Sequence, residues 1–155
     1  MWEEIQYARD ASDLQLNSLF SIRQLFEMAS SVPARVAHID DKVGTLAPGM
    51  LADFFLVSEY PQNDLPLADD YYNTLSKRTT SIDLVVINGI PVYGDPAMLK
   101  SLNIATEPLK LCGTEKALNS AALPNGPFAQ VEARLREKMK AVGSELGPLD
   151  SCPKP

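Results

Sequence analysis

The only histidine of the chain, His38, is followed closely by two carboxylates, Asp40 and Asp41. Histidine and aspartate are common zinc ligands and proton carriers, but a catalytic zinc needs about three protein ligands and one open position. One histidine followed by two aspartates matches no recognised ligand geometry, so we interpret His38 as a helix-end histidine that bonds to its neighbours. The residues by themselves therefore predict no catalytic, cofactor-binding or metal-binding residue in this chain.

Two cysteines, Cys112 and Cys152, are the other candidates for chemistry. Cys112 would need a base such as His38 brought to it by the fold in order to act as a nucleophile. It follows Leu109 and Leu111, which favours a buried and inert thiol. Because two distant cysteines make neither a disulfide framework nor a closed zinc site, we expect a reducing, cytoplasmic location.

Charged side chains are concentrated near the end of the chain, in a segment with helical periodicity. Glu132 and Arg136 are spaced to form an ion pair one turn apart. A helix face exposed to solvent accounts for the pattern. The alternative, which is the functional interpretation, is a docking surface for an acidic partner. The other charged residues of this segment are Arg134, Glu137, Lys138 and Lys140.

Composition limits the classes of protein that this chain can belong to. It has 155 residues, 45% of them apolar, and a formal net charge of −6. A chain of this length can bury a core without disulfides or metal ions to stabilise it. Its net negative charge argues against nucleic acid or an anionic membrane as a partner. No stretch approaches the roughly 20 apolar residues that cross a bilayer. The glycines mark turns and form no phosphate-binding loop.

The first 36 residues have the signals of helices. Apolar residues of the first segment fall on one face, but no capping residue precedes it, so we expect a helix that belongs to a longer helical region. Ser21 and Gln24 form a capping box for a second helix that we expect to end near Val32. Pro33 is expected to open a further short turn through Val36.

Beyond Asp41 the pattern becomes extended. Residues 47–50 predict a type II turn, and 54–57 an apolar strand covered on both faces. Residues 58–80 have no clear period and are expected to form an irregular loop. A hairpin is expected over 82–93, with a type I′ turn at Asn88 and Gly89, and Pro91 restricts its second strand to an edge or a bulge.

Three further elements are expected in the last third of the chain. Asp95 and Pro96 are typical of the start of a short helix, which should run through Leu102. Residues 109–112 are expected to form a weak strand. The final helix should begin near Pro127 and end at Gly143.

Five short segments follow one another in a fixed order: 21–29 (SIRQLFEMA), 32–35 (VPAR), 43–49 (VGTLAPG), 51–57 (LADFFLV) and 85–95 (VVINGIPVYGD). This series resembles the C-terminal part of metal-dependent hydrolases of the amidohydrolase superfamily, particularly the cytosine deaminase and chlorohydrolase-like branch. The resemblance covers about residues 1–100. The segment from Leu109 onward looks like an extension found in some members.

The resemblance implies a mixed, α+β fold in three parts. Residues 1–41 would be the last helical part of an incomplete TIM barrel, and 42–112 the C-terminal strands of a small β-sandwich, the composite domain. Residues 113–155 would be a C-terminal extension with one amphipathic helix. Asp53 matches an Ala-Asp element of the family, where we expect a structural hydrogen bond at the start of a strand.

The resemblance also implies a divalent metal, zinc or iron, in the full-length family. Its ligands are a His-x-His pair, further histidines, often a Lys or Glu, and an Asp, and none can be matched in this sequence. We do not assign the role of the missing Asp to Asp10 or Asp13. We therefore expect no cofactor in this chain and no activity of the chain alone.

Three roles are consistent with these expectations. The chain is the C-terminal part of a hydrolase that acts on non-peptide carbon–nitrogen bonds, a non-catalytic protein-interaction module, or a complementing subunit of a split hydrolase. Its partner would be the missing N-terminal barrel portion or another covering chain. A small-molecule substrate would bind only to the complete enzyme.

Overall fold

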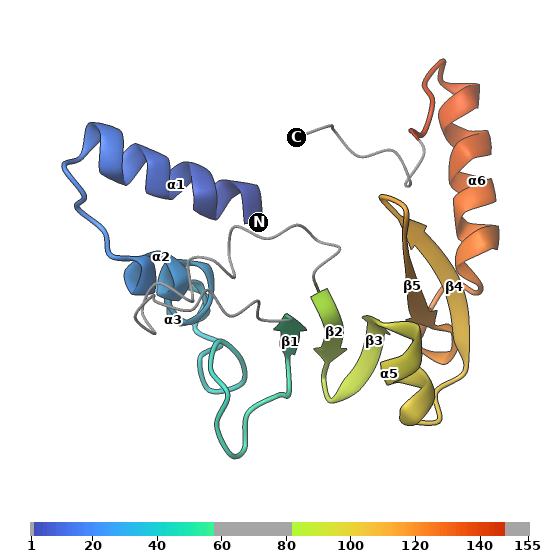
Figure 1. Ribbon diagram of the computed structural model, residues 1–155, viewed down its shortest axis with the longest axis horizontal. Helices are drawn as coiled ribbons and strands as arrows, with labels where there is room; N and C mark the ends of the chain where they lie inside the picture. The colour runs from blue at the N-terminus through green and yellow to red at the C-terminus, as the bar shows by residue number, and fades with distance from the viewer. Residues whose placement is uncertain (1, 58–81, 148–155) are drawn as a thin grey trace.

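The computed structural model describes residues 2–57 and 82–147. Helices form the N-terminal segment, an antiparallel sheet follows, and one long helix comes near the C-terminus (Figure 1). The mixed helix-and-strand class expected from the sequence is therefore confirmed, while the assignment of the helices to a TIM barrel stays a prediction. The loop expected over 58–80 lies outside the described residues.

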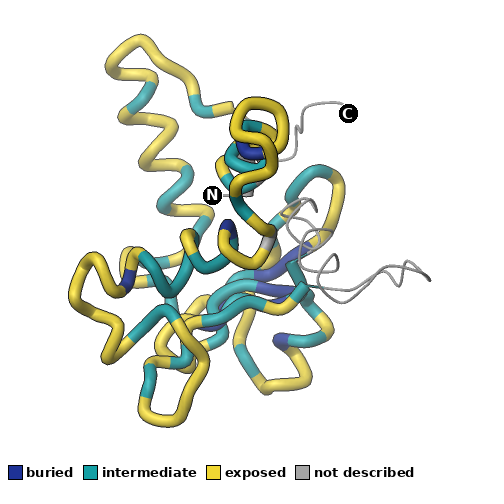
Figure 2. Tube along the Cα trace, turned by 90° about the vertical axis from the view of Figure 1, so that its left-hand side faces the viewer, coloured by how far each residue is buried: buried dark blue, intermediate teal, exposed yellow. Residues whose placement is uncertain are grey.

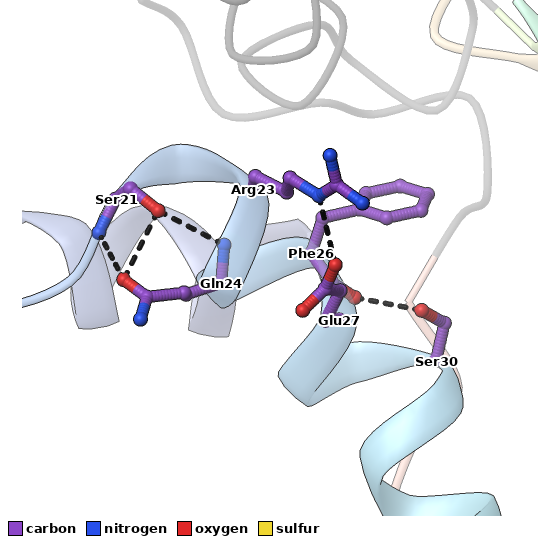
Figure 3. Close-up of polar contacts among 6 residues, drawn as sticks. All are labelled: Ser21, Arg23, Gln24, Phe26, Glu27 and Ser30. Carbon is purple, nitrogen blue, oxygen red and sulfur yellow. Dashed lines mark hydrogen bonds and ion pairs between the residues drawn. The ribbon is translucent and has the colours of Figure 1, made fainter.

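Three helices make up the N-terminal segment: α1 (Trp2–Gln15), α2 (Ile22–Ala29) and α3 (Ser31–Val36). The predicted capping box of α2 is confirmed. The Gln24 backbone N–H donates to Ser21 Oγ at 3.3 Å, and the Ser21 N–H donates to Gln24 Oε1 at 2.9 Å (Figure 3). This cap is local, so a short run of sequence was sufficient to predict it.

The expected end of α2 near Val32 is wrong. The helix ends at Ala29 because Ser30 leaves the helical region, with φ −131° and ψ −85°, and its hydroxyl donates to the Phe26 carbonyl oxygen at 2.8 Å (Figure 3). The following helix α3 begins at Ser31, ahead of Pro33. Pro33 then lies in a first helical turn, where a missing N–H leaves no hydrogen bond unmade.

Five strands form one antiparallel sheet in the order β1-β2-β3-β5-β4. The sheet begins at an edge strand that follows the helical segment and ends at a hairpin formed by the last two strands (Figure 1). The strands are β1 (Phe54–Val57), β2 (Ile82–Ile87), β3 (Ile90–Gly94), β4 (Thr106–Leu111) and β5 (Thr114–Asn119).

The first part of the sheet agrees with the sequence in most respects. Met50 N–H donates to the Ala47 carbonyl oxygen at 3.1 Å with Gly49 at φ +90°, as a type II turn requires. Asn88 and Gly89 both have positive φ, and the ladder shifts register between Val85 and Val86, next to the pair of Val86 with Pro91, so the type I′ turn and the bulge are confirmed. The strand 54–57 is not covered on both faces, because Leu56 is 43% exposed.

The second hairpin was predicted only in part. The expected strand over 109–112 is the end of β4, and β5 was not predicted. A tight turn at Cys112 and Gly113, with φ +51° and +78°, joins the two strands. Asn-Gly or Asp-Gly is the usual sequence of such a turn, and Cys-Gly does not give that signal. The boundary expected between 112 and 113 falls in this turn.

One face of the sheet carries the core. Helix α5 (Pro96–Ser101), which follows Asp95 as expected but ends one residue before Leu102, packs here and buries Leu99 completely. Buried Leu84, Val86 and Ala117 surround Leu99, and Phe54, Met98 and Ile104 pack at the margin. Figure 2 shows that buried residues are few and that most lie around the strands.

The last helix, α6 (Phe128–Ala141), follows a short 3-10 turn, η2 (Ser120–Ala122), and agrees with the predicted range. Gly143 after it has φ +73°, the usual conformation just beyond a helix end. In Figure 1, α6 and α1 lie toward opposite ends of the longest axis. No helix within the described residues has both the length and the apolar content that a bilayer span requires.

Candidate functional site

His38 lies just beyond α3 and is exposed, with φ +56°. Its backbone N–H donates to the Arg35 carbonyl oxygen at 3.1 Å, a bond that any residue at this helix end can make. Asp40 and Asp41 are exposed as well. In residues 2–57 and 82–147, His, Cys, Asp and Glu side chains form no group of three that could hold a metal ion. The residues that the structure describes therefore do not fit the divalent metal that the resemblance implies.

Cys112 is disulfide-bonded, so the expected free, inert thiol is wrong. Its position in the turn between β4 and β5 gives it a positive φ of 51°. The only other cysteine in the sequence, Cys152, lies outside the described residues. A disulfide sulfur is not a thiolate, so Cys112 is not a nucleophile in this state.

Asp53 has the structural role expected of it. Its carboxylate accepts the backbone N–H of Asn88 at 2.5 Å, and next to this bond the Gly89 N–H donates to the Ala52 carbonyl oxygen at 3.0 Å. The chain entering β1 thus binds the turn that joins β2 and β3. Asp53 orders the end of the sheet, and the structure gives it no chemical task.

Replacing Asp53 with alanine is expected to lower the free energy of unfolding by roughly 1.5 kcal/mol, because one charge-assisted hydrogen bond to a backbone N–H is lost. Urea unfolding followed by far-UV circular dichroism measures this loss. The matched variant Asp53→Asn keeps an oxygen that accepts the same N–H, so it should retain most of the stability. Equal losses in both variants would contradict the assigned hydrogen bond.

Two polar residues that were not predicted to be site residues, Tyr93 and Lys116, lie on one face of the sheet. Tyr93 on β3 pairs with Leu118 on β5, and Lys116 lies two residues from Leu118, so Tyr93 and Lys116 are on the same sheet face. Lys116 is 4% exposed, and its ammonium donates to the Ile82 carbonyl oxygen at 2.9 Å. No sequence pattern indicated that Lys116 would be buried, because the strand that contains it was not predicted.

The Tyr93 hydroxyl is buried and has no hydrogen-bond partner among the described residues. Burial raises the pKa of Tyr93 above its ordinary value, and the negative charge of nearby Asp95 raises it further. Both effects keep the phenol protonated in the folded protein. Tyr93 therefore does not act as a base near neutral pH.

Replacing Tyr93 with phenylalanine is expected to raise the free energy of unfolding by about 1 kcal/mol at neutral pH, because it removes a buried hydroxyl without a partner. Above pH about 10 the tyrosine of the unfolded chain ionises while folded Tyr93 keeps its proton, so the wild type loses stability as pH rises. The variant should show a smaller alkaline loss. Urea unfolding at pH about 7 and about 10.5 measures both effects, and a destabilised variant at neutral pH would show that the hydroxyl has a partner.

A groove of about 330 Å³ lies over the β4–β5 hairpin, beside the start of α5. Its lining combines apolar and oppositely charged side chains, from Pro96, Thr106, Pro108, Leu109, Lys110, Glu115, Lys116 and Ala117. The ladder alternation places the Lys116 side chain on the opposite sheet face from Ala117. Because Lys116 is one of the lining residues, the groove reaches the residue that carries the buried ammonium.

The basic residues of α6 have partly internal roles. Arg136 forms the predicted ion pair with Glu132 at 2.6 Å and also donates to the Leu146 carbonyl oxygen at 2.8 Å. Arg134 donates to the Asn125 carbonyl oxygen at 2.8 Å. These hydrogen bonds join α6 to the segments that precede and follow it. Two of the four cations of α6 are thus committed within the chain.

Comparison with known proteins gives a family match. A model described as the amidohydrolase family matches residues 1–92, which is more than half of the chain. The match ends within β3 and includes α1, α2, α3, β1, β2 and the Asp53 contact. No curated protein and no solved structure gives a significant match.

Proposed function

The chain belongs to the amidohydrolase family, and from this premise we propose that it is the C-terminal part of a hydrolase acting on carbon–nitrogen bonds other than peptide bonds. The complete enzyme would use water to release ammonia from an amino-heterocycle or to open a cyclic amide, as the cytosine deaminase and chlorohydrolase-like branch implies. The metal of that reaction would be held by another portion of the enzyme. This chain would stabilise that portion and would not supply its ligands.

The exposed apolar surface of the helical segment carries the proposal. After α1, this segment and the turns following it leave Leu19 61%, Val36 76% and Leu46 71% exposed, while Leu25 and Ala34 are its buried apolar residues. Large apolar side chains left this exposed are candidates for a surface that another protein part covers. A barrel portion would supply that cover. We assign the barrel contact to α2, α3 and the loop up to Leu46.

The sheet edge at β1 favours the complementing subunit and the interaction module as second candidates. Among the described strands, β1 pairs with β2 alone and is therefore an edge strand of the described sheet. An edge strand can be extended by a strand from another chain. In all three cases a covering chain is required, and the roles differ in whether the resulting complex hydrolyses a substrate.

The proposal is tested with the tagged full chain, purified from its own cells at native salt and in recombinant form. Both samples are assayed with Zn²⁺ or Fe²⁺ for ammonia release from cytosine and for ring opening of dihydrouracil. We expect turnover in the native eluate that a chelator abolishes, and none with the recombinant chain. Elemental analysis of the recombinant chain after dialysis should show far less than one metal ion per chain.

A surface variant links the activity to the proposed contact. Val36→Glu combined with Leu46→Glu places charges on exposed apolar positions, so the fold should be kept while the activity of the native eluate is lost. The control Leu102→Glu alters a half-exposed leucine on the sheet portion and should have no such effect. Chelator-sensitive turnover by the recombinant chain alone, or an inactive native eluate, would overturn the proposal.

A further inference from the structure

The outward face of α1 combines two large apolar residues with a carboxylate. Tyr7 is 74% exposed and Leu14 is 84% exposed, and Asp10 between them is also exposed. The spacing i, i+3, i+7 places these three side chains on one side of a helix. We call them the α1 face. The helix as a whole is acidic, since residues 2–15 contain four Asp or Glu and one Arg.

Helix α6 has a face with the same spacing and the opposite charge. Leu135 is 46% exposed, Val142 at the helix end is 80% exposed, and exposed Lys138 lies between them. We call these three side chains the α6 face. The described side chains of α6 include none that is fully buried. The helix is basic, with four Lys or Arg and two Glu over 128–141.

Asp10 and Lys138 are the charged residues of the two faces, and neither is held by a polar contact to another residue that the structure describes, in contrast to other charged residues of the same helices. Asp13 binds Arg9 at 3.2 Å, and Glu132 binds Arg136 at 2.6 Å. Within the described part of the chain, neither Asp10 nor Lys138 forms a hydrogen bond or ion pair. Each is therefore available to a partner of opposite charge without breaking a contact that stabilises its own helix.

We propose that the α1 face of one copy packs against the α6 face of a second copy of this chain, with Asp10 facing Lys138. Figure 1 shows α1 and α6 at opposite ends of the molecule, so the two faces cannot meet within one chain. The matching spacing brings apolar residues against apolar residues and the carboxylate against the ammonium. Two such contacts related by a two-fold axis close a dimer.

Charge also selects this arrangement over pairing of identical faces. Two α6 faces would place Lys138 near Lys138 of the other copy, and two α1 faces would do the same with Asp10. The contact is independent of the proposed hydrolase role, whose covering chain is assigned to α2, α3 and the following loop. Failure of one proposal therefore leaves the other open to its own test.

Charge reversal in the full chain tests the contact by sedimentation velocity over a range of protein concentrations. Asp10→Lys or Lys138→Glu should each weaken self-association about tenfold, because an attractive surface pair becomes repulsive. An equimolar mixture of the two variants should regain association, since every contact between unlike chains again joins opposite charges. The double variant should also associate as the wild type does.

Matched controls separate this contact from net charge. Lys140→Glu changes the charge by the same amount on the opposite side of α6, and Asp41→Lys does so at an exposed site outside both helices. Both should associate like the wild type. Leu14→Ser should weaken association at low and high salt alike, because its contribution is apolar.

The following results would overturn the proposed contact. A wild type that stays monomeric at every concentration would refute it. An effect of only one of the two single variants would show that Asp10 and Lys138 do not face each other across the contact. Two single variants that both weaken association but do not complement each other on mixing would also rule out the α1–α6 contact.

Discussion

Replacing Gly94 with alanine is expected to lower the free energy of unfolding by about 3 kcal/mol. A Cβ atom at this position would lie 2.5 Å from the Asp83 carbonyl oxygen and 3.2 Å from Leu84 Cα. The carbonyl is fixed, since it accepts the Asp95 backbone N–H at 2.8 Å. Neither backbone can move away without breaking the pairing of β2 with β3, and forced overpacking in a core costs in this range.

Urea unfolding followed by far-UV circular dichroism measures the effect of the Gly94 substitution. Gly147→Ala is the matched control, because a Cβ at Gly147 would meet no atom within 4 Å. That variant should stay within about 0.5 kcal/mol of the wild type. If Gly94→Ala were equally mild, the close approach of β2 to the end of β3 would be wrong.

Replacing Glu107 with alanine is expected to lower the free energy of unfolding by roughly 2.5 kcal/mol and to release α6. The carboxylate of Glu107 on β4 accepts the backbone N–H groups of Phe128 at 2.7 Å and Ala129 at 2.9 Å. Pro127, the residue at the cap position, makes no side-chain hydrogen bond to the helix. Glu107 therefore supplies the cap from the sheet and adds a negative charge where the helix dipole favours one.

Two measurements separate release of α6 from general loss of stability. Amide hydrogen exchange should accelerate more over Phe128–Ala141 than over the core amides of β2, whose protection should fall only by the loss of global stability. Glu107→Gln keeps one oxygen acceptor and should lose about half as much stability, and Glu115→Ala, at an exposed position on the same hairpin, should lose little. Unchanged protection of α6 in Glu107→Ala would show that other contacts hold the helix.

Locally specified features were predictable from the sequence. The capping box at Ser21 and Gln24, the type I′ turn at Asn88 and Gly89, and the helix start at Asp95 depend on residues within four positions of one another. Their backbone conformations are set by side chains that bond nearby groups or by glycine at positive φ. The match to the amidohydrolase family likewise follows from ordered local segments.

Features that depend on distant residues were missed. The segment that forms β5 has few residues typical of strands, and its conformation comes from pairing with β3 and β4. The burial of Lys116 and of the Tyr93 hydroxyl also arises from packing across the fold. Periodicity reports which face of an element is apolar and does not report what that face will contact.

The sequence alone determined the capping box of α2, the turn at Asn88 and Gly89 and the family, because each is encoded in short segments whose geometry is local. Only the tertiary structure decided that Glu107 caps α6 across 21 positions, that Lys116 is buried, and that α1 and α6 lie at opposite ends. These depend on strand pairing, in which the register brings together side chains whose separation along the chain carries no signal.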